Sequence, residues 1–160
     1  MPMRAIMEVT DIAGESKLDG YEDQIDIYSV DFGVDQSAAM QVGSGLSVGK
    51  AMVGPISVGK QFDAASVYLA LASMTGKGLE EVKLTFLKDA GDEHLDYLTI
   101  TMTNAVVANY SMSGSSDGEI HETVVFGYEE VDFLYKVQGD DQSAGDEHEV
   151  GFKVGPGKAK

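Results

Sequence analysis

The stretch QIDIYSVDFGV, residues 24–34, alternates apolar side chains with small or polar ones at a period of two. Successive side chains of a β-strand point to opposite faces, so this period predicts a strand. One face would carry Tyr28, Val30, Phe32 and Val34, and the other Ser29, Asp31 and Gly33. We expect the second face, which is small and polar, to look outward.

The same period recurs along the rest of the chain and indicates a mainly β fold. It is found at residues 5–10, 81–86, 98–103 and 130–137, and a further strand is expected over 119–126. Nineteen glycines against three prolines supply turns between short strands. With 160 residues and 43% hydrophobic content, the chain can form one compact domain with a genuine core.

A single helix is expected among these strands. Asp63 is a favoured N-cap residue, an Ala- and Leu-rich run follows over 64–72, and Gly76 provides a C-terminal stop. The sequence therefore predicts a short helix that packs closely on a sheet.

The glycine-rich stretch 36–60 before the helix predicts a long extended loop. It is too apolar for a flexible polar linker, so another surface must cover its apolar side chains. We expect this surface to belong to a neighbouring subunit, and the alternative is an ordinary hairpin folded back on its own domain. The candidate interface residues are Met40, Val42, Leu46, Val48, Met52, Val53 and Ile56.

After Gln138 the composition turns to Gly, Asp, Glu and Lys. This change predicts a domain over residues 1–138, followed by an acidic, glycine-rich tail over 139–160 that is solvated or loosely attached.

The charge and the cysteine count exclude several classes of protein. A formal net charge of -16 opposes binding to nucleic acid phosphates and to anionic membranes. The absence of cysteine excludes disulfides, thiolate zinc sites and a cysteine nucleophile. The N-terminal residues lack the apolar stretch of a secretory signal, and no apolar run approaches membrane-spanning length. We therefore expect a soluble protein without a cleavable signal peptide, made in the cytoplasm.

Three short motifs suggest chemistry, but their context favours loops. Residues 45–49 match the G-x-S-x-G nucleophile elbow around Ser47, although no helix follows directly. Residues 54–60 resemble a phosphate-binding loop, yet Gln61 supplies no hydroxyl for magnesium. The sequence Ala-Gly-Asp-Glu-His occurs twice, at 90–94 and 144–148, without the spacing of a known metal site. We expect no catalytic residue, no metal and no cofactor.

Several motifs in a fixed order resemble the hemolysin-coregulated protein (Hcp) family of type VI secretion tube proteins. They are Gly14-Glu15-Ser16, residues 25–34, Phe62-Asp63-Ala64-Ala65-Ser66, Leu95-Asp96-Tyr97-Leu98, Gly114-Ser115-Ser116-Asp117-Gly118 and Glu122-Thr123-Val124-Val125-Phe126. The resemblance covers about residues 4–137, and weak motifs in the correct order are together far more specific than any one of them.

This resemblance implies a small β-barrel of two packed antiparallel sheets with one flanking helix and a long loop. It also implies a structural protein without enzyme activity, which forms hexameric rings that stack into the inner tube of a contractile secretion apparatus. The implied partners are further copies of the chain, secreted effector proteins held in the ring lumen, the spike protein and the sheath. Such proteins leave the cell through the apparatus.

The sequence departs from the family pattern in residues 30–32. Val30 and Phe32 occupy places that usually hold tryptophan, which suggests a repacked core of lower volume. Asp31 replaces a small uncharged residue, and Ser29 and Asp31 are candidates for the lumen surface. A more acidic pore would prefer basic cargo. The alternative functions are a tube protein of a phage-like contractile particle and a monomeric module that binds a small ligand.

Overall fold

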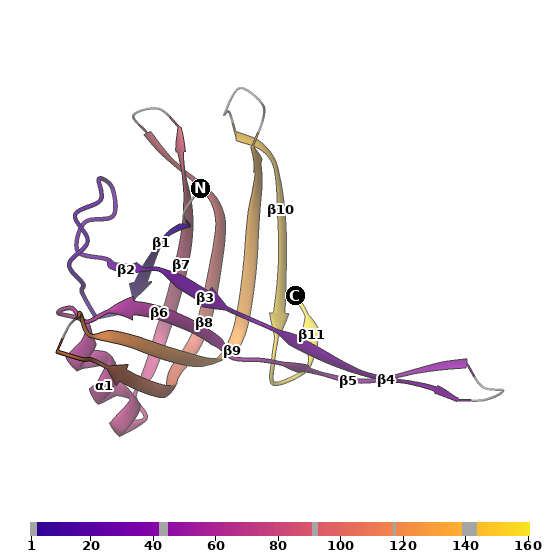
Figure 1. Cartoon of the computed structure of the whole chain (residues 1–160). Coiled ribbons are helices and arrows are strands. Elements are labelled where there is room, and N and C mark those ends of the chain that lie inside the picture. Colours follow the sequence, from indigo (N-terminus) through magenta and orange to yellow (C-terminus); the bar gives the residue numbers. More distant parts are fainter. Residues whose placement is uncertain (1–2, 42–44, 91–92, 117, 139–143) are drawn as a thin grey trace.

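The computed structural model describes residues 3–41, 45–90, 93–116, 118–138 and 144–160, with the backbone alone for 37–41, 45–50, 90, 93 and 144. In chain order its elements are β1 Arg4–Val9, β2 Ile25–Ile27, β3 Ser29–Asp31, β4 Val34–Gln41, β5 Gly45–Val53, β6 Ile56–Gln61, α1 Ser66–Thr75, β7 Gly78–Ala90, β8 Glu93–Ser113, β9 His121–Gln138, β10 Ala144–Lys153 and β11 Lys158–Ala159. The predicted mainly β fold, with one helix in the described part of the chain, is confirmed (Figure 1).

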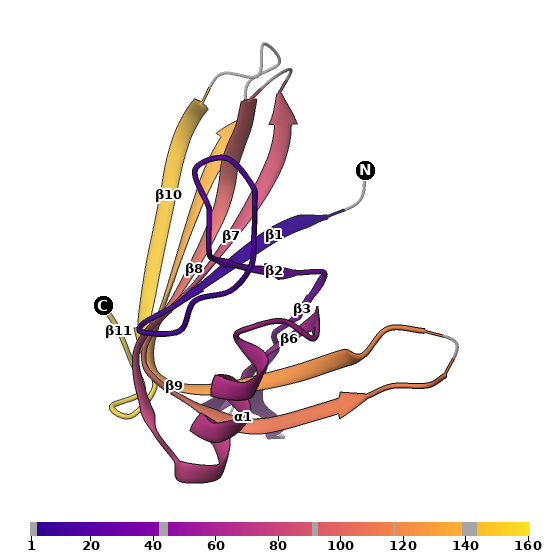
Figure 2. The same ribbon diagram turned by 90° about the vertical axis from the view of Figure 1, so that its left-hand side faces the viewer.

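Nine strands form one antiparallel sheet that curls into two layers (Figure 1, Figure 2). The long strands β8 and β9 belong to both layers. In one layer they lie with β7, β1, β2, β10 and β11, and in the other β9 also pairs with β6, which pairs with β3. The two packed sheets of the prediction are therefore halves of one sheet, and the second sheet is a separate ribbon of β4 and β5.

An irregularity in β8 accounts for the curl. The register between β8 and β9 shifts between Val107 and Asn109, which places an extra residue in β8. A β-bulge of this kind bends the strand and increases its twist. Asn104, with φ of 52°, and Gly127 of β9 lie close to the same point. The sheet consequently turns over on itself there.

The stretch that suggested one strand over residues 24–34 forms three shorter strands instead. β2 pairs with β1, whereas β3 pairs with β6. Only Tyr28 lies between β2 and β3. The period of two is real, but the chain bends at Tyr28 because its two halves pair with different layers. In the described residues no ladder joins β2 to β6, so the two layers do not close into the β-barrel that the resemblance implies.

The core lies between the two layers and is almost entirely apolar. Ile25, Ile56, Leu84 and Phe126 are fully buried in it, and the partly buried Val30 packs against them. Phe32 remains 39% exposed and lies against Phe133, with ring centroids 5.3 Å apart. Of the two places that tryptophan usually takes in the family, therefore, only that of Val30 borders the core.

The helix α1 begins later than predicted and ends where predicted. A turn precedes it, in which the Ala65 N–H donates to Asp63 Oδ1 (3.0 Å) and the Asp63 N–H donates to Ser66 Oγ (2.9 Å). Asp63 thus organises the approach to the helix and does not cap it directly, because Ala65 holds the N-cap position. Gly76 ends the helix with a left-handed φ of 66°, which glycine adopts without strain.

The loosely attached tail predicted after Gln138 is wrong for the described residues 144–160. β10 pairs along most of its length with β9, and β11 pairs with β10. The side chain of Lys160 also lies 2.7 Å from Asp132 and 2.9 Å from Glu130. A boundary at residue 138 would therefore cut through the main sheet.

Candidate functional site

The predicted long loop is a β-ribbon, which we call the arm, made of β4 and β5. The arm extends away from the two layers and does not fold back on them (Figure 1). Near its base, Val34 is 51% exposed and Met52 is 73% exposed, while Val53 is half-buried. The arm therefore offers apolar side chains that its own chain leaves uncovered.

The predicted interface residues fall into three groups. Met52 and Val53 are on the arm, with Met52 well exposed. Met40, Leu46 and Val48 lie in β4 and β5, where the backbone alone is described, and Val42 lies outside the described residues. Ile56 is a correction: it starts β6 and is fully buried in the core of its own chain, opposite Phe126, so it cannot face another subunit.

A second apolar surface, which we call the helix face, lies on the outer side of α1. It consists of Val67, Tyr68, Leu71 and Met74, with exposed fractions of 55%, 59%, 54% and 81%. These positions are three or four residues apart or adjacent, and therefore share one side of the helix. The sequence prediction placed the helix on the sheet but missed this surface, and the signal was present, because residues 64–76 contain no charged side chain.

The outward face of the layer formed by β3, β6, β9 and β8 carries small side chains. Residues paired across neighbouring strands point to the same face. The ladders align Ser29, Gly59, Thr123 and Ser111 in one row, and Asp31, Ser57, Val125 and Asn109 in the next. Asp31 is exposed and Ser29 half-buried, so the outward orientation predicted for this polar side holds for Asp31. We call these two rows the small-residue face.

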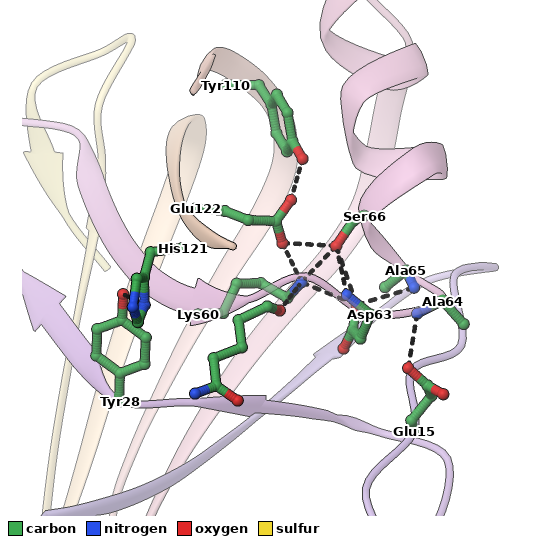
Figure 3. Close-up of polar contacts among 11 residues, drawn as sticks. Glu15, Tyr28, Lys60, Asp63, Ala64, Ala65, Ser66, Tyr110, His121 and Glu122 are labelled. Carbon is green, nitrogen blue, oxygen red and sulfur yellow. Dashed lines mark hydrogen bonds and ion pairs between the residues drawn. The ribbon is translucent and has the colours of Figure 1, made fainter. Parts of the chain in front are cut away.

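Beneath the small-residue face lies a buried network of polar side chains (Figure 3). Lys60 and Glu122, directly opposite each other on β6 and β9, are 0% and 1% exposed and form an ion pair. Lys60 Nζ also donates to Asp63 Oδ1 (2.8 Å) and to Ser66 Oγ (2.9 Å). Ser66 Oγ in turn donates to Glu122 Oε1 (2.6 Å), and the Tyr110 hydroxyl donates to Glu122 Oε2.

The network joins the start of the helix to the sheet. It also settles the resemblance of residues 54–60 to a phosphate-binding loop, because residues 56–61 form β6 and Lys60 points into the protein. No local pattern predicts this pairing, since Lys60 and Glu122 are far apart in the chain. A buried lysine is tolerated here because carboxylates and hydroxyls replace its water shell.

Two tyrosines are held in their protonated form. Burial, followed by the hydrogen bond to Glu122 and the charge of that residue, raises the pKa of Tyr110. Burial raises the pKa of Tyr128 to about 12, and its hydroxyl donates to Gly54 O at 2.6 Å. Both shifts favour the neutral phenol in the folded state.

Stability is therefore expected to fall in alkaline solution. Because the folded pKa of Tyr128 lies above the unfolded value of about 10, its contribution is complete below about pH 10 and is lost as the pH rises toward 12. Urea denaturation at a series of pH values should show a shallower decline for Tyr128→Phe than for the parent. Tyr135→Phe, at a residue that is 44% exposed, is the control. An unchanged slope in Tyr128→Phe would contradict the assignment.

The motif Gly14-Glu15-Ser16 has a structural role in the loop between β1 and β2. A Cβ atom on Gly14 would lie 2.5 Å from Gln24 O, so only glycine fits. Glu15 Oε2 accepts the Ala64 N–H (3.0 Å) in the turn before the helix. Ser16 is buried, and its Oγ accepts the Leu18 N–H (3.3 Å). The motif thus ties the loop after β1 to both β2 and the start of α1.

The other sequence motifs form no reactive centre in the described residues. Ser47 lies in a strand, without a helix directly after it. His94 pairs with Asp89 at 2.8 Å, and the ring of His121 packs edge-on against Tyr28. No group of three potential metal ligands occurs in the ranges that the structure describes. No helix there is long and apolar enough to cross a membrane.

Comparison with known proteins gives the family. The chain matches the model for the family described as type VI secretion system effector, Hcp, over residues 6–135. It is 30% identical over 139 residues to protein hcp1 of Pseudomonas aeruginosa, covering 86% of either chain. The chain belongs to the Hcp family of type VI secretion tube proteins.

Comparison with solved structures agrees with this family membership. A type six secretion system protein superposes with a TM-score of 0.92 at 29% identity, covering 99% of both chains. Hcp1 from Salmonella typhimurium superposes with a TM-score of 0.83 at 28% identity, covering 100% of both chains. The agreement includes β10 and β11, since nearly the whole chain is covered.

Proposed function

We propose that this chain is the repeating subunit of a type VI secretion inner tube, in which six copies form a ring and the rings stack. The subunit is structural, without enzyme activity of its own, and carries effector proteins in the ring lumen. Membership of the Hcp family supports this proposal, and the single structural observation that carries it is the arm. An apolar ribbon that leaves its own domain is explained best if a second copy covers it.

The small-residue face supports the assignment of Ser29 and Asp31 to the lumen. Short side chains such as those of Ser29, Ser57 and Ser111 leave a smooth surface past which a protein cargo could travel. Asp31 adds one exposed carboxylate to each subunit, and hence six to each ring. The cargo favoured by this surface is basic.

Asp31→Ser is expected to weaken retention of a basic effector by the ring. The carboxylate attracts positive charge, and serine keeps the surface small while removing the charge. Pull-down of a basic effector at low and at moderate salt measures the change, and retention should fall most at low salt. Glu119→Gln, outside the two rows, is the control. Equal retention by Asp31→Ser and its parent would refute the role of Asp31.

The remaining partners follow from the same proposal. The subunit is made in the cytoplasm, joins a tube that the sheath surrounds and the spike protein tips, and leaves the cell with the tube. The charge of -16 is consistent with a protein that binds neither nucleic acid nor anionic membrane.

Light scattering coupled to size exclusion tests the proposal directly. We expect a mass near six protomers, and ring-shaped particles in negative-stain electron microscopy. A single chain at high concentration would refute it, and a single chain with a small molecule bound would favour the ligand-binding alternative. Genome context separates a type VI tube from a phage-like particle.

Assembly is expected to depend on salt. Each subunit brings a formal charge of -16, so a ring concentrates like charge that dissolved ions screen. Sedimentation should show more rings, and especially more stacked rings, at moderate ionic strength than at very low ionic strength. Profiles that do not change with salt would count against this expectation.

A further inference from the structure

The arm and the helix face lie on opposite sides of the molecule. In Figure 1 the arm extends to the right while α1 lies at the lower left. Figure 2, viewed from that left side, has α1 in front, with the arm pointing away from the viewer. A subunit therefore cannot cover its own helix face with its own arm. A neighbouring subunit in the same orientation can, because its arm points toward that side.

Both surfaces carry little charge within a strongly acidic chain, since Asp35 and Lys50 are the charged residues of β4 and β5 and the helix has none. Residues 36–49 of the arm contain no charged side chain, and neither do residues 64–76, which include the helix. The rest of the chain carries the net charge of -16. Like charge opposes most contacts between two copies, so contact is favoured where neutral apolar surfaces meet.

Two different surfaces on opposite sides of a subunit make a head-to-tail contact. Contacts of this kind produce a closed ring when the rotation between subunits closes, and an open filament when it does not. The arrangement of the arm and the helix face is therefore one from which a ring can be built.

We propose that the helix face, formed by Val67, Tyr68, Leu71 and Met74, is the surface on which the arm of the neighbouring copy docks. This inference rests on the proposed self-assembly and names the acceptor surface for the arm. Met52 is the exposed apolar side chain of the arm that we expect to meet the helix face. It shares one face of the arm with its cross-strand partner Asp35, while Val34 lies with Val53 on the other face.

Cysteine cross-linking tests the contact, because the chain contains no cysteine of its own. The double variant Met52→Cys/Met74→Cys places one thiol on the arm and one on the helix face, on opposite sides of each subunit. A short bismaleimide should join successive copies into a ladder of covalent oligomers. Each single variant, and Met52→Cys/Val150→Cys with its second thiol on β10, should give no ladder beyond a dimer.

A charge exchange provides the second measurement. Met74→Glu should raise the concentration needed for half-maximal ring assembly by about 100-fold, since a charge would be buried in an apolar contact. Adding Met52→Lys should restore at least about 10-fold of this loss, because the two new charges attract each other across the contact. Both positions are exposed in the single chain, so the fold should keep its thermal stability.

The outcomes separate the inference from the function on which it rests. A ladder from the double-cysteine variant and rescue by Met52→Lys support the inference. A parent protein that forms rings, with no ladder and no effect of Met74→Glu, overturns the inference and leaves the proposed function standing. A parent protein that stays a single chain overturns both.

Discussion

Replacing Met52 by aspartate is expected to convert the particle in solution from a ring to single chains. Met52 is 73% exposed on β5 near the base of the arm, so the fold of the single chain does not depend on it. In an assembled ring the same position would be covered by apolar surface, where a carboxylate loses its hydration without gaining a partner. We expect at least about a 100-fold rise in the concentration at which half of the protein is assembled.

Light scattering over a range of protein concentrations measures this effect. Val150→Asp, which adds the same charge at a 67% exposed valine on β10, is the matched control and should keep the mass of the ring. Ring mass retained by Met52→Asp at all concentrations would show that the arm does not mediate assembly.

The second large effect is a loss of stability, expected when one member of the buried ion pair is removed. Lys60→Met leaves Glu122 buried with only the Ser66 and Tyr110 hydroxyls as donors. Breaking a buried ion pair on one side typically costs about 3–5 kcal/mol, because the remaining charge is uncompensated. We expect about 3 kcal/mol, and hence a melting temperature lower by about 6–12 °C.

The double variant Lys60→Met/Glu122→Gln is the test of mechanism. Glutamine has nearly the shape of glutamate and carries no charge, and its oxygen can accept from one of the two hydroxyls while its amide group donates to the oxygen of the other. It should therefore recover at least about 1 kcal/mol of the loss, since the buried charge is gone. The measurements belong in the Met52→Asp background, because assembly would otherwise raise the apparent stability. A double variant less stable than Lys60→Met alone would show that the charge of Glu122 is not what destabilises the single variant.

Local sequence signals predicted most of the elements. Alternation over residues 81–86 and 98–103 corresponds to β7 and β8, and Gly76 ends the helix as expected. Each of these features depends on a period, or on a residue with special backbone freedom, that a short window of sequence contains. The mainly β class and the projecting arm followed from the same kind of signal.

Pairing between distant residues could not be predicted in this way. Nothing near Lys60 in the sequence indicates that Glu122 will stand opposite it, and a glycine-rich context made Lys60 resemble a phosphate ligand instead. Ile56 looked like part of the arm because composition does not mark the point where a ribbon ends and a core strand begins. The period of two over residues 24–34 gave the faces correctly at Val30 and Asp31 but could not reveal that β2 and β3 have different partners.

The prediction of a tail after residue 138 is wrong over residues 144–153 for a related reason. β10 has little apolar surface, with Asp146, Glu147 and Glu149 all exposed, because it lies near the margin of the sheet and meets the core only through Phe152 near its end. Charged side chains on such a strand discourage pairing with other chains. A polar composition is therefore compatible with regular structure when backbone hydrogen bonds to β9 hold the strand.

The passage of β8 and β9 through both layers has a mechanical consequence. A force that pulls the layers apart acts along unbroken backbone and along rows of hydrogen bonds, and does not merely separate two surfaces of side chains. We expect the two layers to unfold together, so those amide protons of residues 98–107 and 109–113 that are hydrogen-bonded to β9 should exchange with solvent in a single cooperative event. A subunit built in this way can transmit a force from one layer to the other without the two layers sliding past each other.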